Sequence, residues 1–250
     1  MDRLTANNIS VSYGGNKIIE DISIVLHKGE IVSLLGASGV GKTTLFNVLS
    51  GLLVPDSGTI AMDDEDITGK TGKLSYMLQK DMLLPFKTIV DNVALPLVIK
   101  GKKKKEARQT ASSYFEEFGL SGTENKYPKQ LSGGMRQRAA LLRTYLFSDQ
   151  VALLDEPFSA LDTITKSNLH QWYLMVMENI KLSTLFITHD IDEAILLSDR
   201  IYIMTGKPGH ITEELAVDAR KPRGEDFLVS DEFIRYKKHI SMVLKQQEQK

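Results

Sequence analysis

The sequence predicts an α/β protein built around a mostly parallel β-sheet. Short apolar runs that are typical of strands buried on both faces occur at residues 31–35, 151–154, 184–187 and 200–204. Segments in which apolar residues have helical spacing separate these runs. Because strands that alternate with helices line up in parallel, we expect the runs to form one sheet. A chain of 250 residues with 42% hydrophobic content can enclose such a sheet in one large domain.

The N-terminal segment predicts an antiparallel β subdomain. Apolar residues alternate with other residues in two runs, Ile9, Val11 and Tyr13, and Ile22, Ile24 and Leu26. Between them, residues 14–16 read Gly-Gly-Asn, a composition typical of a tight turn. Two strands joined in this way form a hairpin.

A helix is expected after the run at residues 31–35. Leu45, Val48, Leu49 and Leu52 fall at i, i+3, i+4 and i+7, which gives one apolar stripe that can pack on the sheet. Residues 55–58, Pro-Asp-Ser-Gly, predict a turn that ends this segment.

Residues 85–148 change character toward helix and are interpreted as an inserted α-helical subdomain. Helical spacing is carried there by Ala107, Ala111, Tyr114, Phe115 and Phe118. Residues 1–84 and 149–215 then form the main core, including the β subdomain, within a single domain over residues 1–250. Residues 216–250 are expected to form a helical tail, with Phe233, Ile240 and Leu244 at rough helical intervals and a frayed end.

Composition excludes several classes of function. The 32 acidic and 31 basic side chains leave a formal net charge of -1, so a nucleic-acid partner is not expected. The absence of cysteine excludes disulfides, thiolate metal sites and a cysteine nucleophile. The start lacks a secretory signal, and no run reaches the roughly 18 apolar residues of a membrane span. A role at a membrane would therefore require a partner protein.

A phosphate-binding loop follows the first predicted central strand. The motif G-x-x-x-x-G-K-[ST] is matched by Gly36-Ala37-Ser38-Gly39-Val40-Gly41-Lys42-Thr43, which lies between a buried strand and an amphipathic helix. We count the next residue, Thr44, as part of the same phosphate-binding site. Its glycines let backbone N–H groups point at phosphate oxygens, and the following helix presents its positive end to the same anion. Lys42 adds a mobile charge, and the Thr43 hydroxyl is a hard oxygen that Mg²⁺ accepts. The loop predicts binding of a ligand with several phosphate groups together with Mg²⁺.

Two adjacent carboxylates, Asp155 and Glu156, follow the run at residues 151–154, at the strand end where ligands bind in parallel sheets. We expect Asp155 to hold the Mg²⁺ shell through water. Since neighbouring residues on an extended chain point in different directions, Glu156 can instead accept a proton from the attacking water. The pair predicts hydrolysis rather than binding alone.

The string Leu131-Ser132-Gly133-Gly134-Met135-Arg136-Gln137-Arg138 resembles the signature sequence of ABC ATPases. Physically, residues 132–134 open a helix whose buried side carries Ala139, Leu142 and Leu146, which gives a second helix start able to receive an anion. The resemblance implies a P-loop NTPase core in which each ATP lies between the phosphate loop of one subunit and the signature of another. It therefore implies a homodimer.

Other residues fit the same family in order. Gln79 resembles the loop glutamine that touches Mg²⁺ and the hydrolytic water, and His189 resembles the switch histidine that contacts the γ-phosphate. Residues 159–162 resemble the loop that crosses to the other subunit, and Tyr13 falls where the family stacks an aromatic ring on adenine, although it also continues a strand of core residues. The implied site comprises catalytic Glu156, His189, Gln79 and Lys42, metal-binding Thr43, Gln79 and Asp155, and nucleotide-binding Tyr13, residues 36–44, Ser132, Gly133, Gly134 and Asp162.

Residues 83–93, 155–162 and 188–194 resemble a narrower group, the ATPases of nitrate, sulfonate and taurine importers. Phe86 stands where that group usually has Trp, and Arg136 stands where Gln is common. The resemblance implies a subunit on the cytoplasmic face of the cell membrane that drives an integral membrane permease, with an external substrate-binding protein. The implied cargo is a small anion such as nitrate, a sulfonate or taurine, or a vitamin precursor.

A soluble ABC ATPase of DNA repair or translation is the alternative. Such proteins usually carry long coiled-coil insertions or two nucleotide domains, whereas this sequence has no sustained heptad run and one phosphate loop.

For each of two segments, the sequence allows two interpretations of its role. Residues 77–86 are rich in Met and Leu and lie where the family docks a cytoplasmic helix of the membrane subunit, but core packing would favour the same composition. Residues 102–105 are four lysines that could touch anionic lipid or form a solvated helix end.

Overall fold

The computed structural model describes residues 1–148, 150–159, 163–221 and 223–248. Within them, an antiparallel sheet in the order β2-β1-β4-β5 contains β1 (Asp2–Tyr13), β2 (Asn16–His27), β4 (Ser57–Met62) and β5 (Glu65–Asp66). A second sheet, in the order β10-β9-β3-β8-β7-β6, contains β3 (Ile31–Leu35), β6 (Ser75–Met77), β7 (Val151–Asp155), β8 (Ser183–Thr188), β9 (Arg200–Thr205) and β10 (His210–Ala216). Its neighbouring strands are parallel except for β9 and β10. The predicted fold class is confirmed.

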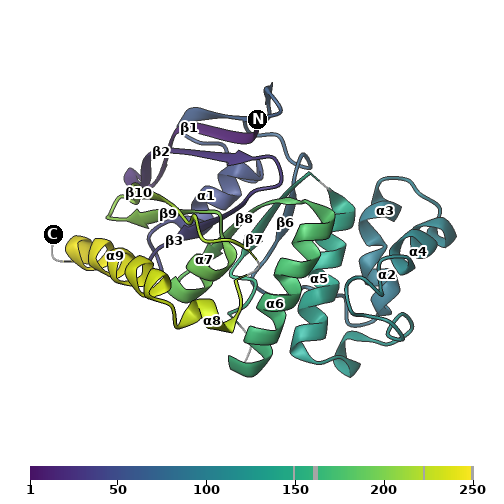
Figure 1. The fold of residues 1–250 in the computed structure, drawn as a ribbon. Coiled ribbons are helices and arrows are strands. Elements are labelled where there is room, and N and C mark those ends of the chain that lie inside the picture. The colour runs from purple at the N-terminus through teal and green to yellow at the C-terminus, as the bar shows by residue number, and fades with distance from the viewer. Residues whose placement is uncertain (149, 160–162, 222, 249–250) are drawn as a thin grey trace.

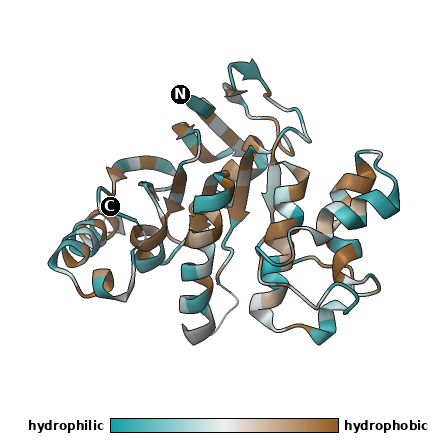
Figure 2. Ribbon diagram, turned by 45° about the vertical axis from the view of Figure 1, so that its right-hand side comes forward, coloured by the Kyte–Doolittle hydropathy of each residue, from teal (hydrophilic) through white to brown (hydrophobic). Residues whose placement is uncertain are grey.

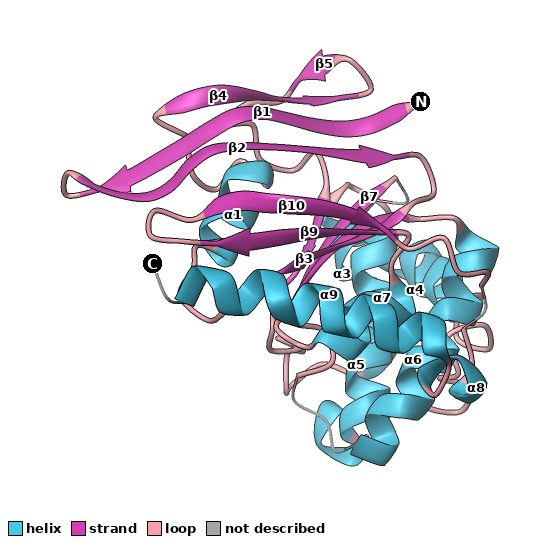
Figure 3. Ribbon diagram, turned by 60° about the vertical axis from the view of Figure 1, so that its left-hand side comes forward, coloured by secondary structure: helices cyan, strands magenta, loops and turns pink. Residues whose placement is uncertain are grey.

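The phosphate-loop helix α1 (Lys42–Leu49) lies between the two sheets, as Figure 3 shows. Helices α5 (Gly133–Phe147) and α6 (Thr163–Ile180) cover the opposite face of the six-stranded sheet (Figure 1). Side chains of β7 alternate between the two cores: Leu153 packs with α1 and the antiparallel sheet, whereas Ala152 and Leu154 pack toward α5 and α6. This two-residue period explains why the strand reads as continuously apolar in the sequence.

Helix α1 ends earlier than the sequence pattern predicts. Gly51 adopts φ 75°, a left-handed conformation that ends the helical path. Leu52, assigned above to the buried stripe, is 65% exposed instead. The predicted turn at residues 55–58 is also shorter than expected, because β4 already begins at Ser57.

Helices α2 (Ile89–Val93), α3 (Leu95–Ile99) and α4 (Lys104–Ser112) and the short 3₁₀ helix η1 (Pro128–Gln130) precede α5 in the chain. In Figure 1, α2, α3 and α4 lie beyond α5, on the side away from α6. Helix α4 ends at Ser112, so Phe115 and Phe118 belong to the turns that follow it and not to the predicted helix. Both rings are nevertheless buried, because these turns keep them packed against the same core.

The C-terminal residues fold against the far edge of the molecule. Helices α7 (Ile191–Leu197), α8 (Glu225–Leu228) and α9 (Asp231–Glu248) are found there, and α9 runs beside β9 and β10 (Figure 3). The predicted tail residues Phe233 and Ile240 are buried, and Leu244 packs against the same cluster. The sequence pattern did not reveal strand β10.

One buried arginine ties this region together. Arg223 is 2% exposed, and its guanidinium donates to the carbonyl oxygens of Ile195, Leu196, Ser198, Val217 and Ala219. The first three carbonyls lie at the end of α7, where unpaired carbonyl groups and the negative end of the helix dipole favour a cation.

Hydrophobic residues concentrate in the strands and on the inward faces of the helices, whereas α4 and α9 carry many hydrophilic residues (Figure 2). None of the helices in the described residues has the combination of length and apolarity that a bilayer-spanning segment requires.

Candidate functional site

The loop between β3 and α1 is shaped by glycines that no larger residue could replace. A Cβ atom on Gly36 would lie 2.4 Å from the carbonyl oxygen of Met204. Gly41 has φ 111°, and a Cβ there would lie 2.4 Å from Cγ2 of Ile19. No side chain in the described residues forms a hydrogen bond that caps the start of α1. The backbone N–H groups at this helix start are therefore left for a ligand with several oxygens, as a triphosphate has.

Lys42 is the first residue of α1, directly after this loop, and its side chain is largely buried. Its Nζ donates to the carbonyl oxygens of Gly36 at 2.7 Å and Ala37 at 2.8 Å. Burial lowers the pKa of Lys42, while the negative charges of Glu156 and Asp155 oppose that change. A buried cation of this kind gains stability when an anion binds beside it, so the loop fits a phosphate group.

Asp155 ends β7 beside the same loop. Its Oδ2 accepts a hydrogen bond from Thr43 Oγ1 at 3.3 Å and another from the Tyr76 hydroxyl at 3.5 Å. Burial raises the pKa of Asp155, the Thr43 bond opposes this change, and the nearby charge of Glu156 adds to it. A divalent cation would relieve this poorly solvated carboxylate. The hydroxyl and carboxylate oxygens here therefore fit Mg²⁺, which prefers such ligands together with phosphate oxygens and water.

Glu156 is the next residue, and its side chain contacts different groups from those that contact Asp155. Gln79 Nε2 donates to Glu156 Oε2 at 3.0 Å, and His189 Nδ1 lies 3.1 Å from Oε1. The residue adopts φ 44°, which is uncommon for a residue with a side chain, and Ser159 holds the turn by donating its backbone N–H and hydroxyl to the Glu156 carbonyl. Such backbone strain is found disproportionately at functional sites.

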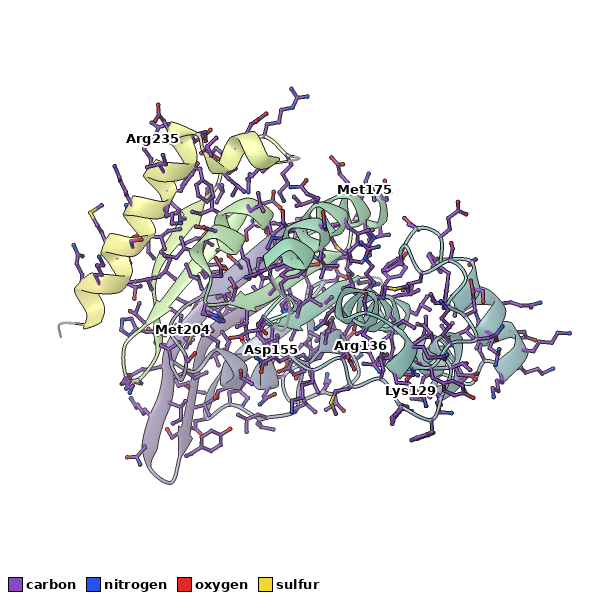
Figure 4. The ribbon with its side chains drawn as sticks, turned by 90° about the horizontal axis from the view of Figure 1, so that it is seen from below. Lys129, Arg136, Asp155, Met175, Met204 and Arg235 are labelled. Carbon is purple, nitrogen blue, oxygen red and sulfur yellow. The ribbon has the colours of Figure 1, made fainter. Side chains whose placement is uncertain are left out.

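The two carboxylates thus have different surroundings. The sequence predicted this, because neighbouring residues on an extended chain point in different directions. Asp155 meets a threonine hydroxyl from the phosphate loop, whereas Glu156 meets an amide and an imidazole from the loops after β6 and β8. In Figure 4, Asp155 lies between Met204 of β9 and Arg136 of α5. The arrangement can therefore hold a cation on one side and accept a proton on the other.

The residues that resemble a signature sequence begin α5. Ser132 caps this helix by accepting a hydrogen bond from the Met135 N–H at 3.3 Å. Gly133 and Arg136 line a cleft of about 740 Å³ whose walls also include Gln79, Glu156 and His189. Among the described residues, Ser132 forms no hydrogen bond with the phosphate loop of its own chain.

Arg136 and Arg143 join α5 to the loop that carries Gln79. Arg136 Nε lies 3.1 Å from Asp81 Oδ2, and Arg143 donates to the carbonyl oxygens of Asp81 and Met82. Movement of the Gln79 loop is therefore mechanically linked to the helix that starts at Ser132.

Among the described residues, Tyr13 is the predicted nucleotide ligand that is not joined to this cluster. Tyr13 is 50% exposed at the end of β1, so it is not a core residue of that strand. A second cleft, of about 820 Å³, is lined by Gly36, Ala37, Ser38, Val40 and His189 together with residues 204–208, but Tyr13 is not among the described residues that line it. Asp162, and with it most of the loop at residues 159–162, lies outside the described residues. Adenine stacking by Tyr13 stays a prediction.

Sequence reasoning missed the contacts of Tyr76 and Lys166. Tyr76 contacts Asp155 from β6, and Lys166 of α6 contacts the residues around His189. Neither residue belongs to a motif, and each makes its contact across a large separation in the sequence. A pattern search along the chain had no signal for them.

The site has the parts of a P-loop nucleotide hydrolase: a glycine-rich phosphate loop with its lysine, and an acidic pair at the end of a neighbouring strand. Residues 19–159 match the family described as ABC transporter. This chain belongs to the ABC transporter family, and it is an ATPase of that family.

Relatives with similar sequences match this chain over most of its length. It is 48% identical over 215 residues to the formylaminopyrimidine import ATP-binding protein ThiZ of Halalkalibacterium halodurans, covering 86% of this chain and 84% of that protein. It is 36% identical over 249 residues to the nitrate import ATP-binding protein NrtD of Synechocystis sp., covering 97% and 94%. The predicted likeness to importer ATPases is confirmed.

The solved structures give the same assignment. The dimeric structure of the ATP-binding cassette MJ0796 in a post-hydrolysis state, bound to ADP and Pi, matches with a TM-score of 0.72 at 27% identity. The match covers 87% of this chain and 100% of that one.

Proposed function

We propose that this chain acts as a homodimer that binds two Mg²⁺-ATP and uses their hydrolysis to drive import through a separate membrane permease. The observation that carries the proposal is the position of Glu156, whose two carboxylate oxygens contact Gln79 and His189. A carboxylate held between an amide and an imidazole, beside a phosphate loop, is placed to accept a proton from a water molecule that attacks the γ-phosphate.

Each side chain then has a defined task. Glu156 takes the proton as the water oxygen bonds to phosphorus and the bond to the ADP oxygen breaks. Gln79 and His189 hold the Glu156 carboxylate, and His189 also offers a nitrogen to the γ-phosphate. Lys42 offsets the negative charge of the phosphates, together with the N–H groups of the loop.

Thr43 and Asp155 would hold Mg²⁺, with Gln79 as a further ligand. When bound, the ion would neutralise charge on the outer phosphate oxygens. The threonine hydroxyl and the Asp155 carboxylate already face one another, at 3.3 Å, so the donors of this site come from both flanking elements.

Dimerisation would complete each site. The chain has one phosphate loop and one segment that resembles a signature, and Ser132 caps its own helix without bonding the phosphate loop among the described residues. If ATP contacts Ser132 and Gly134 of a partner only when two copies close, ATP favours the closed dimer, because a ligand shifts an equilibrium by its differential contacts. The dimeric MJ0796 cassette supports this arrangement.

A groove beside the Gln79 loop supports a permease partner. Met77 and Leu83 are core residues, whereas Leu78, Met82 and Phe86 are 44%, 56% and 73% exposed. Core packing therefore accounts for only part of the segment at residues 77–86. A cavity of about 390 Å³ lies beside it and is lined by Leu52, Met82, Leu95, Pro96, Ile99 and Phe147 among others. We assign this apolar groove to a cytoplasmic helix of the permease, which would place the chain at the inner face of the membrane.

The lysines at residues 102–105 are all exposed, and α4 begins at Lys104. Lys104 lies 3.6 Å from Asp91, so this run is in part the paired, solvated start of a helix. The proposal assigns no lipid contact to it.

The cargo is proposed from the relatives. Their names include importers of nitrate and of formylaminopyrimidine, and the 48% identity to ThiZ favours a vitamin precursor such as a substituted pyrimidine over a small anion. An external protein that captures the cargo would complete the system. A role in DNA repair or translation is not favoured, because these relatives are import proteins and the net charge is -1.

Reconstitution tests the proposal. The chain is purified with its candidate permease in lipid vesicles, and ATP hydrolysis is measured with and without the permease, and separately with DNA or ribosomes. We expect the permease to raise the rate of ATP hydrolysis. We also expect the vesicles with permease to take up the pyrimidine only when ATP is supplied. Stimulation by DNA or ribosomes alone would contradict an import function.

A further inference from the structure

A lysine outside the motifs holds the segment that carries His189. Lys166 Nζ, on α6, lies 2.8 Å from Asp190 Oδ2 and 2.5 Å from Glu193 Oε1. Its side chain is 23% exposed, and that of Glu193 is 5% exposed, so the pair is largely shielded from water. One ammonium group thus bridges the first turn of α7 at two points.

The same carboxylates fix both neighbours of His189. Glu193 Oε2 accepts a hydrogen bond from the Thr188 hydroxyl at 2.5 Å, and that hydroxyl accepts one from the Asp190 N–H at 3.0 Å. Asp190 Oδ1 in turn caps α7 by accepting from the N–H groups of Asp192 and Glu193. The backbone on either side of His189 therefore has few ways to move without breaking a bond to this network.

A second branch reaches the loop of Glu156. His170, one turn after Lys166 on α6, has Nε2 3.6 Å from Glu193 Oε1, and its ring packs edge-on against Phe158 with 4.7 Å between ring centroids. Phe158 follows Glu156 by two residues. The start of α6 thus contacts both loops whose side chains meet at the Glu156 carboxylate.

The ion pair favours the charged forms of Lys166 and Glu193. Burial works against a charged Lys166, but its bonds to Asp190 and Glu193 outweigh burial and raise the pKa of the amine. Burial likewise works against a charged Glu193, yet its contacts with His170, Lys166 and Thr188 lower the pKa of this carboxyl. Lys166 and Glu193 thus form a shielded ion pair, and such a pair fixes geometry more than it adds stability.

We propose that Lys166 is a positioning residue for ATP hydrolysis, which acts by holding His189 and Glu156 in register with each other. The inference rests on the proposed roles of those two residues. Within the part of the chain that the structure describes, Lys166 pairs with Asp190 and Glu193 and contacts neither the phosphate loop nor Glu156. Its loss should therefore slow the chemical step while leaving nucleotide binding nearly unchanged, because small misplacements of catalytic groups can cost up to about 100-fold in rate.

The test compares Lys166→Met and Lys166→Arg with Lys221→Met as a matched control. Lys221 is also 23% exposed and lies 2.7 Å from Asp199, but it is not part of this network. We expect Lys166→Met to lower kcat about tenfold with KM changed less than about twofold, Lys166→Arg to recover most of the rate, and Lys221→Met to behave as the parent chain. A folded Lys166→Met chain with the parental kcat would overturn the proposal.

A double-mutant cycle with His189→Ala, read by single-turnover hydrolysis, separates positioning from general stability. If Lys166 acts through His189, Lys166→Met costs less than about twofold in the His189→Ala background, whereas an undiminished tenfold loss would contradict the mechanism. If Lys166→Met does not fold, the charge-balanced pair Lys166→Met with Glu193→Gln takes its place. A His189→Ala chain of parental activity would instead refute the role proposed for His189, so the two failures are distinguishable.

Discussion

The guanidinium of Arg136 lies 3.1 Å from the carboxylate of Asp81, and this contact joins the helix that starts at Ser132 to the loop that carries Gln79. One end of the link faces the catalytic cluster, and the other opens α5, which would face a second subunit. Arg136, one of two residues that depart from the subfamily pattern, thus connects the Gln79 loop to the helix that would face a second subunit.

Breaking this link should uncouple the chain from its permease. The two side chains are 37% and 29% exposed, so the pair should contribute at most about 1 kcal/mol to folding. We expect Arg136→Met to leave the melting temperature and the basal ATPase rate nearly unchanged and to reduce stimulation by the permease severalfold. Stimulation at the parental level in vesicles would remove Arg136 from the coupling path.

Replacing Glu156 with glutamine should stop turnover without preventing binding. The amide keeps the size of the side chain but cannot take a proton, so we expect kcat to fall at least about 100-fold. With Mg²⁺ and ATP, solution scattering should then report an ATP-bound dimer. Protomers that stay separate at saturating nucleotide would contradict the shared-site arrangement.

Lys42→Ala should act on a different step. Its ammonium group is the buried cation of the phosphate loop, so we expect the Kd for ATP to rise about tenfold or more, which is about 1.4 kcal/mol. Isothermal titration would measure the change, with exposed Lys28→Ala as the control. Unaltered affinity would mean that the backbone N–H groups suffice.

A charge in the apolar groove should block docking of the permease without affecting ATP hydrolysis by the chain itself. Ile99 is 73% exposed and lines the groove beside residues 77–86. We expect Ile99→Glu to abolish stimulation by the permease while the basal ATPase rate is retained. Val229→Glu, at a residue that is 78% exposed near α8, is the matched control, and an equal loss of stimulation there would argue against a specific groove.

Glu193 should make the stability of the chain depend on acid pH. Its pKa is lowered in the folded state from an ordinary value of 4.5, so its contribution is fully present above that pH and is lost as the pH falls through the folded-state pKa. We expect Glu193→Gln to lower the melting temperature at pH 7 by roughly 5 °C. This difference should shrink as the pH falls below about 4.5, as thermal unfolding followed by circular dichroism would show. A constant difference would mean that packing, not charge, is lost.

The sequence revealed those parts of the site that are built by short segments. Consecutive residues encode each of these parts: the phosphate loop, the acidic pair and the capped start of α5. The buried strands can be predicted because their residues are almost all apolar. The end of α1 was misjudged, because one left-handed glycine overrides an apolar pattern that would continue to Leu52. The exposure of Met82 and Phe86, and the bridge made by Lys166, depend on contacts between distant segments. No local pattern carries that information.

Arg223 has a consequence for how the chain can be shortened. Its guanidinium gathers carbonyl groups from the end of α7 and from the residues after β10, so the last strand of the sheet is not where the fold closes. Removing Arg223 together with the residues after it would leave those carbonyl groups without their donor. A shortened chain therefore has to retain Arg223, and a chain that also lacked α9 would expose the core that Phe233 and Ile240 cover.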